Sequence, residues 1–140
     1  MNMDAAVRRA LEITPASSAR ARTVDITTIG SKTGRPRRIE VWFYRVDDEI
    51  YLTTTPAHRA WYGNIVAHPE FTFHLKHGVR ADLAAVGTRV RDEATRRRVF
   101  SAVIDDLNQP SNPAGLPQPV TPLEEWMSGS PLIHVTFPEG

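Results

Sequence analysis

The segment 38–46, RIEVWFYRV, constrains the fold most, because it is apolar on both faces of an extended chain. Successive side chains of a β-strand point to opposite faces of the sheet. A strand with this pattern is therefore expected to be covered on both sides. The two faces consist of Ile39, Val41 and Phe43, and of Trp42, Tyr44 and Val46.

Five further segments have the composition of strands and are separated by turn residues. In 71–76, FTFHLK, apolar and polar residues alternate strictly, which predicts one buried face and one wet face. The apolar positions of 79–91 shift by one residue beside Gly87, and this shift predicts a β-bulge. Asp47-Asp48 is expected to form a tight hairpin turn. The remaining predicted strands are 23–29, 49–55 and 131–137.

Segments whose apolar residues have helical spacing separate these strands. A capping residue, Asp92, and an apolar stripe predict a helix over 92–107. The stretch 108–122 contains five prolines and is predicted to be a tethered loop. About six antiparallel strands with accessory helices indicate a mainly β (α+β) fold, a barrel whose closure removes the sheet edges. Further helices are expected over 4–13, 57–69 and the LEEWM segment.

Composition excludes several classes of protein. Apolar residues make up 41% and charged residues 24% of the 140 positions, as in ordinary globular domains. No stretch is long and apolar enough for a membrane span, and the absence of cysteine excludes disulfides. The formal net charge of +1 is too small for a dedicated nucleic-acid binder. A cytoplasmic protein is expected.

The stretch 29–38, IGSKTGRPRR, concentrates positive charge in a loop between two predicted strands. Its glycines, Gly30 and Gly34, permit a tight backbone whose amides can surround an anion. Arginine binds phosphate or carboxylate in a bidentate manner. An anion site is therefore predicted, with a solvated basic hairpin as the alternative. The cationic residues are Lys32, Arg35, Arg37 and Arg38.

Two further groups are candidates for ligand contact. The threonines 53–55 end a strand just before a helix, where hydroxyls and free amides can bind a polar ring or a phosphate, although the preference of threonine for strands also explains them. Trp61, Tyr62 and Asn64 offer an aromatic surface with hydrogen-bonding groups, although core packing also explains Trp61. The run 96–98 of three arginines is predicted to be a solvated helix face.

The five histidines do not indicate a metal site. His74 and His77 are three positions apart, which places them on opposite faces of a strand, and no carboxylate or cysteine pattern accompanies them. No metal is therefore expected.

Three segments resemble the deazaflavin-dependent nitroreductase family, the split-barrel flavin and deazaflavin oxidoreductases related to pyridoxamine phosphate oxidases. They are TTIGSKTGRPRRIEVWFY at 27–44, AWYGNIVAHPEFTFHLK at 60–76 and SPLIHVTF at 130–137. The resemblance implies an FMN-binding-like split β-barrel that binds the deazaflavin coenzyme F-420, a hydride carrier with an acidic polyglutamate tail. The change to strand-like segments at residue 23 divides the single domain into an N-terminal helical segment, 1–22, and a split-barrel cofactor-binding domain, 23–140.

The same resemblance assigns residues to the coenzyme. The matching positions of the basic loop are expected to hold the acidic tail. Those at the end of the 49–55 strand are expected to lie beside the deazaflavin ring. Those of the helix with Trp61 and Asn64 are expected to complete the site. Two departures are Ser31, where relatives often carry arginine, and TTTPAHR at 53–59 in place of a serine-, lysine- and glycine-rich turn. The expected cofactor-binding residues are Lys32, Gly34, Arg35, Arg37, Thr54, Thr55, Trp61 and Asn64.

The implied activity is hydride transfer from reduced coenzyme F-420 to an electron-poor acceptor, namely a quinone, an enone or a nitroaromatic. No catalytic residue is assigned, and Tyr44, Tyr62 and His58 are candidates for proton donation or substrate contact. A homodimer is expected because related split barrels commonly build the cleft between two chains. The alternative functions are a non-catalytic flavin, haem or tetrapyrrole-binding protein, with FMN or haem as cofactor, and a small single-strand-binding barrel.

Overall fold

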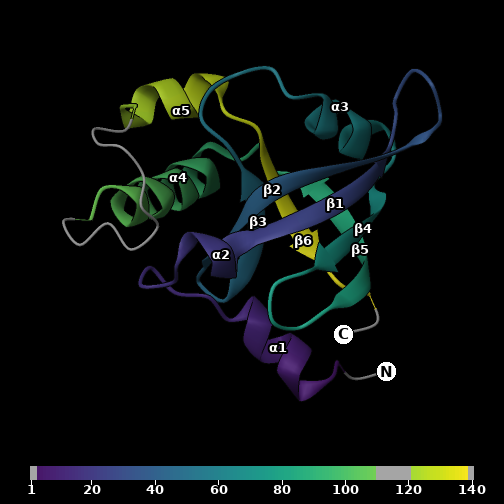
Figure 1. Ribbon diagram of the computed structural model, residues 1–140. Helices are drawn as coiled ribbons and strands as arrows, with labels where there is room; N and C mark the ends of the chain where they lie inside the picture. Colours follow the sequence, from purple (N-terminus) through teal and green to yellow (C-terminus); the bar gives the residue numbers. More distant parts are fainter. Residues whose placement is uncertain (1–2, 110–120, 139–140) are drawn as a thin grey trace.

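The computed structural model of the chain describes residues 3–109 and 121–138 and contains six strands and five helices within them (Figure 1). In chain order the elements are α1 (Ala5–Leu11), α2 (Ala19–Arg22), β1 (Thr23–Ile29), β2 (Pro36–Val46), β3 (Glu49–Thr53), α3 (Ala60–Ala67), β4 (Glu70–Leu75), β5 (Ala81–Arg89), α4 (Glu93–Leu107), α5 (Leu123–Gly129) and β6 (Leu132–Thr136).

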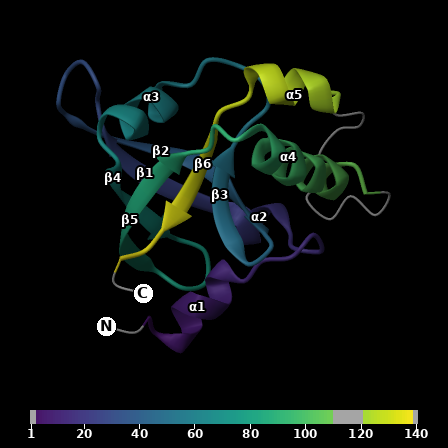
Figure 2. The same ribbon diagram turned by 180° about the vertical axis from the view of Figure 1, so that it is seen from behind.

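The six strands close into a barrel in the order β1-β2-β3-β6-β5-β4, with antiparallel pairing at each interface. The predicted six-stranded antiparallel barrel is therefore confirmed. Figures 1 and 2 show α4 and α5 together on one side of the barrel, α3 beside the loop between β1 and β2, and α1 at the opposite end.

Two apolar clusters confirm that β2 is covered on both faces. Val41 and Phe43 belong to the cluster inside the barrel, whereas Tyr44 packs outside it with Phe100 of α4 and Trp126 of α5. The rings of Phe100 and Trp126 are 5.8 Å apart between centroids. Burial of aromatic side chains at this interface attaches the two helices to the barrel.

The helix cap and the hairpin turn predicted from the sequence are present in the structure. The side chain of Asp4 caps α1, and Asp92 accepts a 2.8 Å hydrogen bond from the Thr95 amide at the start of α4. Asp47 and Asp48 adopt positive φ angles of 52° and 66° in the hairpin turn, as a two-residue turn between antiparallel strands requires. Of the predicted loop 108–122, residues 110–120 lie outside the described residues.

The β-bulge expected beside Gly87 is wrong. The register of β5 runs without interruption from Leu75↔Ala81 to Glu70↔Val86 against β4, and continues from Val86 along β6. Gly87 occupies an inward position itself, where a Cβ would lie 2.5 Å from Cγ2 of Ile65. The apolar pattern shifts because the inward position has no room for a side chain and Val86 faces outward.

His74 is another departure from the expected pattern, because it is buried on the outward face of β4. Its Nε2 lies 2.7 Å from Oγ1 of Thr27, and its Nδ1 lies 2.6 Å from a carboxylate oxygen of Asp82. The hydrogen bond from His74 lowers the pKa of the Asp82 carboxyl below its usual value. These bonds join β1, β4 and β5.

Candidate functional site

One edge of β2 pairs with β1, and the other edge is open along more than half of the strand. β2 pairs with β1 from Pro36 to Trp42, but with β3 only from Phe43 to Val46. No strand among the described residues therefore pairs with the other edge of β2 over residues 36–42. The amide and carbonyl groups along such an edge are available to a ligand.

A hollow of about 460 Å³ lies along this open edge, and we call it the strand-edge hollow. One wall is the 39–42 part of β2, and the opposite wall is the end of β3 with Thr54 and Thr55. Trp61 of α3, Leu107 of α4 and Trp126 of α5 close it. Its size is typical of sites for small molecules or cofactors.

The three threonines of the strand end have different surroundings. Thr53 is buried and its hydroxyl donates a 2.6 Å hydrogen bond to the carbonyl of Pro131, so it fastens β3 to β6. Thr54 is half-buried and Thr55 is exposed, and both line the strand-edge hollow. Arg59 donates to the carbonyl and hydroxyl oxygens of Thr55, at 3.5 Å and 3.3 Å, and lines the same hollow.

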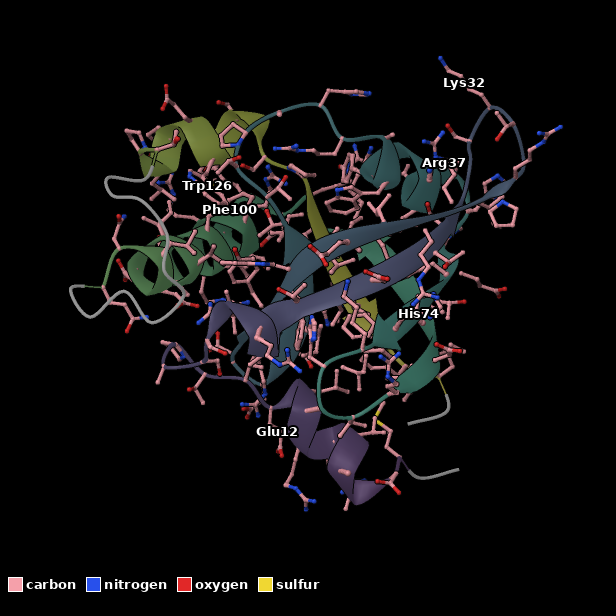
Figure 3. The ribbon with its side chains drawn as sticks, in the orientation of Figure 1. Glu12, Lys32, Arg37, His74, Phe100 and Trp126 are labelled. Atoms are coloured by element: carbon pink, nitrogen blue, oxygen red, sulfur yellow. The ribbon has the colours of Figure 1, made fainter. Side chains whose placement is uncertain are left out.

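The basic loop forms a second hollow of about 350 Å³ with the start of α3, which we call the loop hollow. Lys32 and Arg37 line it from the loop, and His58, Gly63 and Asn64 line it from the side of α3. Figure 3 shows Lys32 at the outer end of the loop and Arg37 beside α3. Neither cation forms an ion pair with a described residue, so both charges are available to an anion.

Asn64 fixes the basic loop against α3. The Asn64 side chain is buried, its Oδ1 accepts a 2.9 Å hydrogen bond from the Ser31 amide, and its Nδ2 donates to Oγ1 of Thr28 at 3.1 Å. Within the loop, the amide of Gly30 donates to the carbonyl of Arg35 at 2.9 Å. The loop that carries Lys32 and Arg37 is thus held in place before any ligand binds.

The structure therefore divides the eight residues expected to bind a cofactor into three sets. Lys32, Arg37 and Asn64 meet at the loop hollow. Thr54, Thr55 and Trp61 meet at the strand-edge hollow. Gly34 and Arg35 are exposed and line neither hollow; Gly34 supplies the turn, with a φ of 69°.

Sequence reasoning missed three residues that complete these walls, namely Arg59, Leu107 and Trp126. Trp126 is buried, and its Nε1 has no hydrogen-bond partner among the described residues. Tyr44 also lines the strand-edge hollow, and burial raises the pKa of its hydroxyl well above the usual value. A neutral phenol is thus present at neutral pH.

Among the described residues, no group of three His, Cys, Asp or Glu side chains is placed to hold a metal ion.

Solved structures share this fold over most of the chain. A conserved hypothetical protein from Mycobacterium tuberculosis is 21% identical, with 99% of this chain and 82% of that chain covered and a TM-score of 0.63. A general stress protein 26-related protein of the pyridoxinephosphate oxidase family from Clostridium acetobutylicum is 11% identical, with 94% and 81% covered and a TM-score of 0.61. An F420-H2 dependent reductase, FDR-A, is 15% identical, with 82% and 94% covered and a TM-score of 0.54. These similarities confirm the split-barrel fold. No curated protein matches the chain.

The family model of the F420H2-dependent quinone reductases matches residues 6–111, which include both hollows except for Trp126. The residues present also fit a deazaflavin coenzyme. An open strand edge and threonine hydroxyls suit the polar edge of a planar ring, and two unpaired cations suit an acidic tail. The chain belongs to the F420H2-dependent quinone reductase family and is an oxidoreductase that uses coenzyme F-420.

Proposed function

We propose that this protein reduces an electron-poor acceptor, a quinone, an enone or a nitroaromatic, with the deazaflavin ring of coenzyme F-420 in the strand-edge hollow and its acidic tail at the loop hollow. The observation that carries the proposal is the open edge of β2. It leads from Arg37, in the loop hollow, to Ile39 and Trp42, in the strand-edge hollow. One strand thus lines both hollows.

Reduced coenzyme supplies a hydride when it is bound. The backbone edge of β2 and the hydroxyls of Thr54 and Thr55 orient the ring. The side chains of Trp61, Leu107 and Trp126 exclude water from the apolar end of the hollow, where a planar acceptor packs against the ring. The neutral phenol of Tyr44 lies in this wall, as a group able to donate a hydrogen bond to an acceptor oxygen.

Fluorescence titration of the protein with coenzyme F-420, FMN and haem tests the cofactor, and oxidation of the reduced coenzyme by a soluble quinone tests the activity. We expect selective binding of the deazaflavin and turnover with the quinone. Binding without turnover of quinone, enone or nitroaromatic acceptors would contradict the acceptor class. Binding of FMN or haem in place of the deazaflavin would contradict the cofactor assignment.

Replacing Lys32 and Arg37 together with alanine is expected to weaken binding of the glutamylated coenzyme by about 10- to 100-fold, since charge-assisted hydrogen bonds to the tail are lost. The tail-less chromophore should bind as it does to the wild type. Arg35→Ala is the matched control, because Arg35 lies on the same loop with the same charge but lines neither hollow. Equal losses for both ligands would exclude a tail contact at this loop.

Gly63 allows the loop hollow to be filled without disturbing the fold. A Cβ at Gly63 meets no atom within 4 Å, and the residue lies inside α3. Gly63→Ala is expected to stabilise the protein by about 0.5–1 kcal/mol in chemical denaturation, because glycine disfavours a helix interior. Gly63→Leu should remain folded but bind the glutamylated coenzyme about 10-fold more weakly, a loss of about 1.4 kcal/mol in binding free energy. Unchanged binding by a folded Gly63→Leu protein would place the tail elsewhere.

A homodimer in the cytoplasm is also part of the proposal, by resemblance to related split barrels. Light scattering on the purified chain measures the assembly, and a monomer at micromolar concentration would contradict it. Among the described residues, no helix has both the length and the apolar character needed to cross a membrane.

A further inference from the structure

A third hollow, of about 450 Å³, has no part in the function proposed so far. We call it the arginine hollow. Its walls are the end of β5 with Arg89 and Arg91, the start of α4 with Arg96, the 127–131 stretch from α5 to β6, and the segment before α3 with His58 and Arg59.

Positive charge in the arginine hollow is not balanced by its own lining. Four arginines line it, and no aspartate or glutamate does. Arg89 and Arg91 are exposed, and neither forms an ion pair with a described residue. By contrast, Arg97 and Arg98, which do not line this hollow, pair with Glu124 and Asp47. Unbalanced cations around a concave surface attract anions.

Arg96 holds the walls of the hollow together. The prediction of one solvated face for the arginine run 96–98 is wrong at this residue. Its guanidinium donates to the carbonyls of Val90, Met127 and Ser130, at 3.1, 3.0 and 3.0 Å. It also stacks on Phe100, with the guanidinium carbon 4.9 Å from the ring centroid. One side chain thus joins the end of β5 to the connection between α5 and β6.

The wall also contains a polar group without a partner. Ser130 is 5% exposed, and its hydroxyl makes no hydrogen bond with the described residues. A buried hydroxyl without a partner costs about 1–3 kcal/mol. The Ser130 hydroxyl oxygen is itself buried, so the free cations are the groups of this lining that carboxylate or phosphate oxygens can reach.

The arginine hollow adjoins the other two. His58 lines both it and the loop hollow, and Arg59 lines both it and the strand-edge hollow. All three hollows therefore meet at the segment 57–60 before α3. His58 thus separates the arginine hollow from the loop hollow, and Arg59 separates it from the strand-edge hollow.

We propose that the arginine hollow is a second anion site, which binds carboxylates spaced along an extended polyanion through Arg89 and Arg91. Arg89 ends β5 and Arg91 follows it two positions later, so an extended backbone separates them by roughly 6–7 Å, which suits two carboxylates spaced along one ligand. The carboxylates have two sources, the distal glutamates of the coenzyme tail or a separate polycarboxylate. The first source rests on the proposed function, whereas the site itself does not.

Calorimetric titration of the full chain with a free oligoglutamate peptide tests the site. The variant Arg89→Ala/Arg91→Ala is expected to lower the affinity by about 10-fold or more, because each charge-assisted contact contributes strongly. The control Arg20→Ala/Arg80→Ala removes two exposed arginines that line none of the three hollows, and should change the affinity by less than about two-fold, as exposed distant charges are screened. Equal losses for both variants would overturn the proposal, as would a wild type that does not bind the peptide.

Coenzyme molecules with shorter and longer tails distinguish the two sources. If the tail reaches the arginine hollow, fluorescence titration should show that affinity rises with tail length in the wild type and not in Arg89→Ala/Arg91→Ala. If length has no effect while the peptide binds, the site takes a separate polycarboxylate. The tail-less chromophore reports the strand-edge hollow alone, so its failure to bind would count against the proposed function and not against this site.

Discussion

Replacing Arg22 with alanine is expected to lower the free energy of unfolding by about 3–5 kcal/mol, the usual cost of removing one member of a buried ion pair. The Arg22 side chain is 0% exposed, and its Nη1 lies 2.6 Å from a carboxylate oxygen of Asp106. Its Nη2 donates to three carbonyls, the shortest bond being 2.7 Å to Ser17. The guanidinium also lies over Trp42, at 5.9 Å. Its loss removes the charged partner of Asp106 and the side-chain donor to the Ser17 carbonyl. Asp106, Thr14 and Pro15 keep hydrogen bonds from the Gln109 side chain or the Ser17 amide.

Urea denaturation of the wild type and the variants measures this effect. Arg45→Ala is the matched control, because Arg45 pairs with a largely exposed Asp48, and such a pair is worth about 0–1 kcal/mol. The double variant Arg22→Met/Asp106→Leu should recover much of the loss, since apolar residues can replace a buried pair. A loss from Arg22→Ala no larger than that from Arg45→Ala would show that the ion pair does not hold the N-terminal segment.

Arg22 shows that local sequence patterns do not reveal contacts between residues far apart in the chain. The strands and the helices α1, α3, α4 and α5 were predictable because hydrophobic spacing and caps are local signals. The helix α2 has only four residues, and its last residue meets a carboxylate 84 positions away. Nothing in the sequence around Arg22 distinguishes it from the exposed Arg20 two positions earlier.

The candidate site was predictable to the extent that it is local. The anion site at the basic loop was predictable because its glycines and cations are close together in the sequence. The division into two hollows depends on where β3 stops pairing with β2, because that point opens the strand edge. Leu107 and Trp126 precede and follow the proline-rich stretch, and only their packing against β2 brings them to the same hollow.

The arginine run 96–98 shows the same limit for charged residues. A sequence pattern places the three arginines on one helix but does not reveal which of them meets buried carbonyls. Arg96 is held by the carbonyls of Met127 in α5 and of Ser130 just after it, more than 30 positions later, whereas Arg97 and Arg98 are exposed. Contacts at long sequence separation therefore decide which cation is structural and which is free to bind a ligand.

Gly87→Val is expected to destabilise the protein by about 3 kcal/mol, at the upper end of the usual cost of overpacking a core. A Cβ at this position would lie 2.5 Å from Cγ2 of Ile65 and 2.9 Å from Cγ2 of Ile133. Both isoleucines are 0% exposed, so neither can move into solvent. Thermal denaturation with chemical denaturation as a check measures the loss.

The same substitution connects the core to the site, because Ile65 belongs to the helix that also carries Gly63 and Asn64. Displacement of α3 should loosen the loop that Asn64 holds, so the remaining folded Gly87→Val protein should bind the glutamylated coenzyme more weakly. The milder Gly87→Ala isolates the steric cause: combined with Ile65→Ala, the double variant should lose less stability than the sum of the single losses, by at least about 0.5 kcal/mol. Additive losses would mean that the crowding at Ile65 is not what excludes a side chain from Gly87.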